Sequence, residues 1–287
     1  MPAVVRIGTC SWADEGLLRA WYPRGVSTAE ARLRYYAERF DTVEVDSPFY
    51  RLPDPAVAGR WARRTPPGFV FHAKAAKGMT HHEDADLVAA VAGFRAALEP
   101  LELSGKLRGV LLQYHPRFVK SRAALAELER VPALLEPLVP LVEFRHRSWL
   151  EEGERADTLA FLERAGLAYV SVDAPATRAS NVLPRLPACT HRVAYVRFHG
   201  RNARTWNIRA DVAWKRFDWL YAPEELQEWV EPLRRLAGEA EEVYAMFNNN
   251  RDDYAPRSAA LLRGLLDEAG VPAAGAVEPP SRDLTLF

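Results

Sequence analysis

The sequence has few of the features that mark secreted, membrane or metal-thiolate proteins. It contains two cysteines in 287 residues, Cys10 and Cys189, which lie far apart. This excludes a disulfide framework and a thiolate metal cluster, and it indicates a reducing compartment. The N-terminus lacks the layout of a signal peptide, and no apolar run is long enough to span a membrane. These absences predict a cytoplasmic protein without a membrane partner.

The chain also lacks net charge, because lysine plus arginine and aspartate plus glutamate both total 38. Composition therefore predicts no strongly acidic or basic partner, and an anion-binding site must come from a local group of basic residues. With 48% hydrophobic residues, a chain of this length can bury one large α/β domain or two small ones.

Eight short runs rich in β-branched residues alternate with segments of helical periodicity. The predicted strands are Val4–Thr9, Thr42–Ser47, Phe69–Lys74, Gly109–Tyr114, Leu141–Arg145, Ala168–Asp173, Val193–His199 and Glu242–Asn248. Ser27 and Glu30 predict a capping box for the helix that follows them. This number of strand and helix units in a chain of this length predicts a single (β/α)8 barrel.

An open doubly wound sheet is the alternative fold. The segment after the first strand, GTCSWADEG, lacks the glycine-rich phosphate loop of such sheets, and polar residues gather at nearly all strand ends. We therefore predict a barrel domain over residues 1–270 and a proline- and alanine-rich tail over residues 271–287. The long segment after the seventh strand, Arg201 to Tyr221, is predicted to fold over the mouth of the barrel.

Polar side chains occupy strand positions where a buried sheet normally has apolar residues. Glu44 and Asp46 share one face of the second strand, and such carboxylates are costly to bury without partners. Active sites of (β/α)8 barrels lie at the C-terminal ends of the strands. The polar residues predicted there are Glu44, Asp46, His72, Lys74, Gln113, Glu143, Arg145, Asp173, Arg197, His199 and Asn248.

The basic residues of this set have two interpretations. Lys74, Arg145, Arg197 and Arg201 can hold an anionic ligand, since guanidinium groups match carboxylate and phosphate geometry. Alternatively, the arginines only neutralise the neighbouring carboxylates.

A divalent metal is a further possibility, with Glu143, Asp173 and His199 as the first-choice ligands. The sequence has no compact ligand motif, so metal binding is the less favoured interpretation. His81 and His82 lie in a polar loop after the third strand, where a helix approach is favoured over an acid-base role.

Six aromatic residues follow predicted strands, namely Trp12, Trp21, Tyr22, Phe49, Tyr50 and Trp149. Their rings are predicted to form the wall of a pocket or to stack on a ring of the substrate. Loop anchors that pack on the barrel have the same sequence pattern, so both interpretations stay open.

Motifs in a fixed order resemble those of the domain-of-unknown-function 72, or YecE-like, family. They are IGTCSW at Ile7, WYP at Trp21, TVEVDSPFYRLP at Thr42, FVFHAKAAKGMTH at Phe69, QYHPRF at Gln113, VEFRHRSW at Val142, YVRFHGR at Tyr195 and FNNN at Phe247. The resemblance implies a (β/α)8 barrel and supplies neither an established reaction nor catalytic residues. Cys10 and Ser11 depart from the more usual Ser-Gly pair before the tryptophan.

The functional prediction is an enzyme that acts on nucleic acid or another phosphate-bearing substrate by hydrolytic or phosphoryl-directed chemistry. Basic residues would stabilise negative charge, one carboxylate would act as base, and His199 would act as acid. The basic residues are Lys74, Arg145 and Arg197, and the carboxylates are Glu44, Asp46, Glu143 and Asp173. The alternatives are a non-catalytic barrel that binds an anion or small molecule, and a metal-dependent enzyme of small metabolites.

The chain ends in DLTLF, which resembles the pentapeptide that binds bacterial sliding clamps. Leu284, Leu286 and Phe287 fit this motif, whereas Asp283 replaces the usual glutamine. We predict an extended tail over Val271 to Arg282 that carries the motif to a DNA-bound clamp. Alternatively, the apolar end folds back on the barrel.

Overall fold

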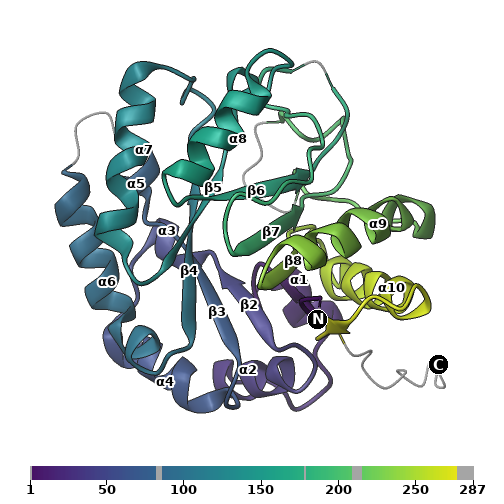
Figure 1. Cartoon of the computed structure of the whole chain (residues 1–287). Helices are drawn as coiled ribbons and strands as arrows, with labels where there is room; N and C mark the ends of the chain where they lie inside the picture. The colour runs from purple at the N-terminus through teal and green to yellow at the C-terminus, as the bar shows by residue number, and fades with distance from the viewer. Residues whose placement is uncertain (1, 82–85, 178, 209–214, 277–287) are drawn as a thin grey trace.

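The computed structural model describes residues 2–81, 86–177, 179–208 and 215–276 (Figure 1). Eight parallel strands form a closed barrel, which confirms the predicted fold. The strands are β1 (Val5–Thr9), β2 (Thr42–Val45), β3 (Val70–Lys74), β4 (Leu107–Gln113), β5 (Val139–Glu143), β6 (Ala168–Asp173), β7 (Val193–Phe198) and β8 (Glu242–Phe247). Neighbouring strands pair in sequence order, and β1 closes the barrel by pairing with β8 and, through Thr9 and Val43, with β2.

Helices surround the barrel, with α6 beside α7 on one side and α9 beside α10 on the other (Figure 1). They are α1 (Glu15–Ala20), α2 (Ala29–Ala37), α3 (Ser47–Tyr50), α4 (Pro55–Arg64), α5 (Lys77–Thr80), α6 (Leu87–Leu103), α7 (Arg122–Leu135), α8 (Arg155–Arg164), α9 (Pro223–Glu239) and α10 (Tyr254–Glu268). A short 3₁₀ helix covers Arg147–Trp149. In the described part of the chain, none of the helices has the length and apolar character needed to cross a membrane.

The cap of α2 differs from the prediction. The side chain of Thr28, and not that of Ser27, accepts a hydrogen bond from the backbone N–H of Ala31. The helix therefore begins one residue later than the predicted capping box requires.

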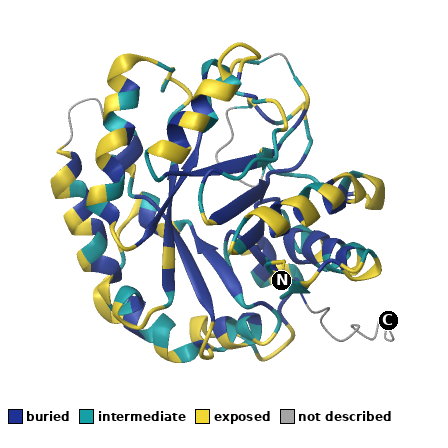
Figure 2. Cartoon of the chain, in the orientation of Figure 1, coloured by how far each residue is buried: buried dark blue, intermediate teal, exposed yellow. Residues whose placement is uncertain are grey.

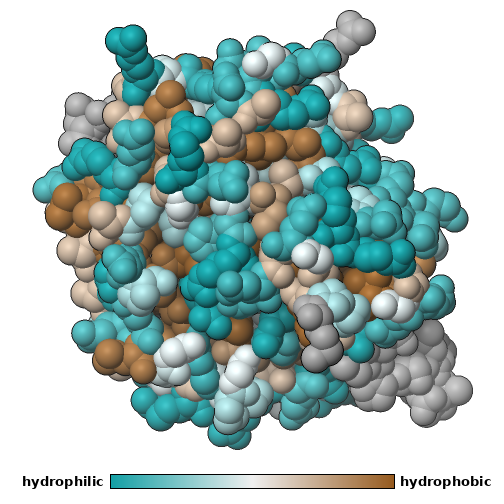
Figure 3. Space-filling model, in the orientation of Figure 1, coloured by the Kyte–Doolittle hydropathy of each residue, from teal (hydrophilic) through white to brown (hydrophobic). Residues whose placement is uncertain are grey.

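The core has an outer and an inner part, because side chains alternate between the two faces of each strand. The outer part lies between strands and helices, and Figure 2 shows the strands and the inner helix faces as buried. The inner part fills the barrel and consists of Cys10, Val70, Leu111, Val139, Leu141, Ala168, Val170, Val193, Tyr195, Tyr244 and Met246. Hydrophilic residues cover most of the face shown in Figure 3, with hydrophobic residues between them in small patches. This inner apolar layer lies beneath the polar residues at the C-terminal end of the barrel.

A ninth strand, β9 (Ala273–Ala274), follows the last helix and pairs with the first half of β1. Gly275 lies beside it with φ of 77°, where a Cβ atom would be 2.5 Å from the carbonyl oxygen of Ile7. Val271 and Ala276 are buried against the barrel. The tail boundary predicted at Val271 is therefore too early, because residues 271–276 belong to the packed domain. The motif residues Leu284, Leu286 and Phe287 lie outside the described residues.

Candidate functional site

Arg197 is the centre of a charge network inside the barrel. Its side chain is fully buried, with Nη2 2.5 Å from Oε1 of Glu44 and Nη1 2.6 Å from Oε2 of Glu143. Strand alternation explains this arrangement, since Glu44, Glu143 and Arg197 all lie on the inward faces of their strands. We call Glu44, Glu143, Arg145, Arg197 and His199 the buried charge network.

Glu143 has the larger number of partners. Gln113 Nε2 donates to its Oε1 at 2.9 Å, and Nε of Arg145 lies 2.5 Å from the same oxygen. Burial alone would raise the pKa of Glu143, but Arg145 and Arg197 outweigh burial and hold this pKa well below its ordinary value. Glu143 is therefore a buried carboxylate that stays ionised.

Glu44 differs from Glu143 in its electrostatic environment. The Tyr195 hydroxyl donates to Oε2 of Glu44 at 2.8 Å, and Arg197 is its cationic partner. Burial and the nearby carboxylate of Asp46 nevertheless raise the pKa of Glu44 above its ordinary value. The two carboxylates bound to Arg197 thus have pKa values shifted in opposite directions.

His199 directly follows the C-terminal end of β7 and lies at this edge of the network. Its Nε2 is 3.0 Å from Nη2 of Arg145, and its Nδ1 is 2.9 Å from Nδ2 of Asn248. Burial and the positive charge of Arg145 lower the pKa of His199 to about 3. The ring is therefore neutral near pH 7, and this environment does not fit the predicted role of His199 as an acid.

Asp173 and Arg201 lie apart from this network. Val172 packs on the inside of the barrel, so the next residue of β6, Asp173, points outward to the helices. Asp173 accepts hydrogen bonds from Tyr221, Trp229 and Arg201 at 2.7, 2.7 and 2.8 Å. This position corrects the prediction that Asp173 and Arg201 face the mouth of the barrel.

The predicted metal set of Glu143, Asp173 and His199 is not assembled, because Asp173 faces the other side of its strand. Among the residues that the structure describes, no group of three or more histidine, cysteine or acidic side chains is placed to hold a metal ion.

Trp12 and Trp149 are loop anchors, which is the alternative that the sequence left open. Trp12 packs edge-on against Trp61, with ring centroids 5.3 Å apart. Trp149 is fully buried, stacks on Phe144 at 4.2 Å and donates from Nε1 to the Phe118 carbonyl oxygen at 2.7 Å. Neither ring lines the pocket described next.

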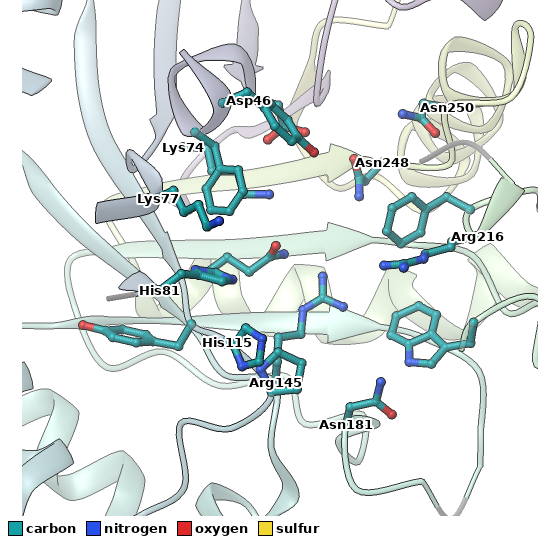
Figure 4. A pocket seen from close by; sticks show the side chains of 17 residues that line it. Asp46, Lys74, Lys77, His81, His115, Arg145, Asn181, Arg216, Asn248 and Asn250 are labelled. Carbon is teal, nitrogen blue, oxygen red and sulfur yellow. The ribbon is translucent and has the colours of Figure 1, made fainter. Parts of the chain in front are cut away.

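A cavity of about 520 Å³ lies above the buried charge network at the C-terminal ends of the strands (Figure 4). We call it the mouth pocket. Six predicted site residues line it, namely Asp46, Tyr50, Lys74, Gln113, Arg145 and Asn248. Its other lining residues include Phe49, Lys77, His81, His115, Asn181, Trp206, Arg216, Phe217 and Asn250. The mouth pocket therefore draws on loops that the strand-based prediction did not use.

Positive charge predominates around the mouth pocket. Lys74, Lys77, Arg145 and Arg216 line it, whereas Asp46 is the one carboxylate among its described lining residues. Lys74 is 8% exposed, and its ammonium group lies 4.5 Å from the centre of the Phe49 ring. Within the described ranges, no carboxylate lies within 4.0 Å of the Lys74 ammonium.

Besides burial, the positive charge around the mouth pocket contributes to a lowered pKa of His81. Its ring packs edge-on against Phe49 at 5.0 Å and against His115 at 5.1 Å. Burial lowers the pKa of His81 to about 4, helped by His115, Lys74, Lys77 and Arg145. Cationic residues that disfavour another positive charge favour a negative one at the same place.

The segment after β7 forms the opposite wall. Gly200 has φ of 86°, and a Cβ atom there would be 2.5 Å from Cβ of Trp219, so only glycine fits this turn. Beyond the turn, Trp206 lies over Arg145 at 5.5 Å, and Phe217 stacks on His199 at 5.4 Å. The described part of this segment thus covers the buried charge network, as the sequence predicts.

The fold is shared with distant proteins. A D-psicose 3-epimerase from Clostridium cellulolyticum aligns with 94% of this chain and 100% of its own, at a TM-score of 0.51 and 11% identity. Identity this low shows only a common barrel fold.

Closer relatives extend over nearly the whole chain. The UPF0759 protein YunF from Bacillus subtilis is 29% identical over 92% of this chain and 95% of its own. A DUF72 family protein from Thermotoga maritima is 31% identical, with a TM-score of 0.81 over 92% of this chain and 99% of its own. A DUF72 family protein from Enterococcus faecalis is 26% identical, with a TM-score of 0.80 over 92% and 96%. The sequence pattern of the family described as "Protein of unknown function DUF72" matches residues 6–282, and the chain therefore belongs to this family.

Proposed function

We propose that the mouth pocket binds an anion and that the protein is an enzyme acting there on a phosphate-bearing substrate. The observation that carries this proposal is the excess of cationic side chains around a single described carboxylate, Asp46. The pocket volume lies within the range of about 300–1,000 Å³ that is usual for small-molecule sites.

Lys74 supports the proposal most directly. A nearly buried ammonium without a carboxylate partner among the described residues costs free energy, and a bound anion offsets that cost. Arg197 contributes less, because Glu44 and Glu143 already neutralise it. The anion-binding role therefore belongs to Lys74, Lys77, Arg145 and Arg216, and not to Arg197 and Arg201.

The proposed chemistry is hydrolytic. Asp46 lies on the wall of the pocket, where its carboxylate would act as the base that activates water. Lys74 and Arg145 would stabilise negative charge that develops on the phosphoryl group. His81, which faces the pocket, is better placed than the buried His199 to supply a proton once an anion is bound.

A non-catalytic anion-binding barrel is the second candidate. The pairing of Arg197 with Glu44 and Glu143 favours it, because this arginine then serves stability and not turnover. Assays with phosphomonoesters and short oligonucleotides distinguish the two candidates, since binding without product formation supports the second.

Sulfate binding is expected to strengthen as pH falls, because a bound dianion raises the pKa of His81. If this pKa rises from about 4 to about 6, sulfate affinity increases about tenfold between pH 7 and pH 5. The sign follows from linkage, since a ligand that favours the protonated ring binds more tightly as protons become available. Sulfate keeps its own charge over this range, and calorimetry at low salt measures the affinity.

The His81→Asn variant is the control for this result and is expected to lose most of the pH dependence. His115 stays in place in this variant as a second imidazole of the pocket. The anion-binding proposal fails if sulfate, phosphate and sugar phosphates all show no binding at low salt.

The sliding-clamp interaction stays a proposal from sequence alone. We propose that Leu284, Leu286 and Phe287 bind a clamp and that the protein works in the cytoplasm on DNA-associated substrates. Deletion of residues 284–287 should abolish retention on an immobilised clamp and leave the melting temperature unchanged. Retention of the shortened chain would contradict the proposal.

A further inference from the structure

We infer that the ligand of the mouth pocket is a nucleotide, with its phosphate at the lysine side and its base against the aromatic residues of the opposite wall and rim. The inference rests on the proposed function and adds the class of substrate.

The two sides of the pocket differ in chemistry, as Figure 4 shows. Lys74 is the last residue of β3, Lys77 is the first residue of α5, and His81 follows α5. Their side chains lie together on one side of the pocket. Asn248 and Asn250 lie on the other side, beyond the end of β8, together with Arg216. A ligand that uses both sides therefore has an anionic end for the lysines and an end with hydrogen-bonding groups for the two amides and the Arg216 guanidinium.

On the asparagine side, the Asn250 side chain hydrogen-bonds to Asp14, but its buried Oδ1 is left without a partner among the described residues. Buried acceptors without partners are rare in folded proteins, and each needs an explanation. The exocyclic amino group of a nucleobase is a suitable donor, since asparagine amides commonly pair with the edges of bases.

Aromatic rings line the pocket on both sides. Trp206 and Phe217 line the pocket with ring planes 80° apart and centroids separated by 6.1 Å. Tyr50 stands at the rim with 76% of its surface exposed, and its ring packs edge-on against Phe49. Aromatic rings at a cationic groove are the usual arrangement for stacking nucleobases.

A sugar phosphate explains less of the site. It accounts for the lysine side but leaves the exposed Tyr50 ring and the Asn250 acceptor without a function. A nucleotide uses the lysines, the amide and the rings in one pose, and therefore fits the pocket better.

The test compares adenosine 5′-monophosphate with ribose 5-phosphate by calorimetry on the full chain. Both ligands carry the same phosphate and a similar sugar, so the ratio of their affinities isolates the base. We expect adenosine monophosphate to bind about tenfold more tightly or better, as base stacking on an aromatic ring predicts. Equal affinities would overturn the inference and leave the proposed function intact, whereas no binding of either ligand would refute both.

Two variants locate the base. Tyr50→Ala removes an exposed ring, and Trp206→Leu removes a ring in the wall. At least one of these variants should lower the affinity ratio at least threefold without weakening the binding of ribose 5-phosphate. Leu103→Ala is the matched control, because Leu103 is 80% exposed on α6 and does not line the pocket. If the affinity ratio is unchanged in both ring variants, the base does not lie against these rings and the inference is wrong.

Discussion

The Arg197→Met variant is expected to unfold with a free energy about 3–5 kcal/mol lower than the parent protein. Methionine fills a similar volume but leaves Glu44 and Glu143 buried without the guanidinium that lies between them. Chemical denaturation in urea near pH 7 measures this loss. A loss below about 1 kcal/mol would show that the remaining partners are enough, namely Arg145 and Gln113 for Glu143 and Tyr195 for Glu44.

The loss of unfolding free energy in the Arg197→Met variant is also expected to depend on pH. Arg145 remains to lower the pKa of Glu143, but without Arg197 the pKa of Glu44, which burial already raises, rises further above its ordinary value. Carboxyl groups shifted in this direction destabilise the fold at high pH, and the penalty shrinks as pH falls through the folded-state pKa values. The control is Arg192→Met, which removes an exposed ion pair with Glu241 at 3.7 Å and should change stability by about 0.5 kcal/mol or less.

The Lys74→Met variant is expected to bind sulfate and adenosine monophosphate about 10 to 100 times more weakly than the parent protein. Its ammonium is the most deeply buried of the lysine charges at the mouth pocket, so its contribution is screened least by solvent. Stability should stay the same or increase, because the substitution removes a buried charge without a described carboxylate partner. Calorimetry and urea denaturation measure the two quantities.

Lys120→Met is the matched control for this variant. Lys120 pairs with Glu154 outside the mouth pocket, so its replacement should leave anion affinity unchanged. Equal affinities of the Lys74→Met variant and the parent protein would show that the anion binds elsewhere.

The barrel could be predicted from sequence because its strands are long enough to show their pattern. Each of the eight predicted strands is present, with its ends shifted by no more than two residues. The ninth strand was missed because Ala273 and Ala274 carry no β-branched or alternating pattern. Its position depends on the contact of Gly275 with Ile7, which no local sequence pattern records.

The candidate site was predictable only where strand alternation decides which way a side chain points. Glu44, Glu143, Arg145 and Arg197 share the inward face, as the two-residue spacing predicts. Asp173 was misplaced because nearness to a strand end does not say which face a residue occupies.

The loop contributions were harder to predict. Lys77, His115 and Arg216 reach the mouth pocket from segments after the strands, where no periodicity fixes direction. A basic segment directly after the third strand, AKGMTHH, was the one signal that pointed to Lys77 and His81.

The pairing of β9 with β1 joins the two ends of the chain. β1 begins at Val5, and its partners β8 and β9 are the last strands to be made. During synthesis the first strand therefore waits with an open edge until β8 and β9 have left the ribosome. Exposed strand edges pair readily with other chains, so incorrect pairing of the nascent barrel is favoured during this interval.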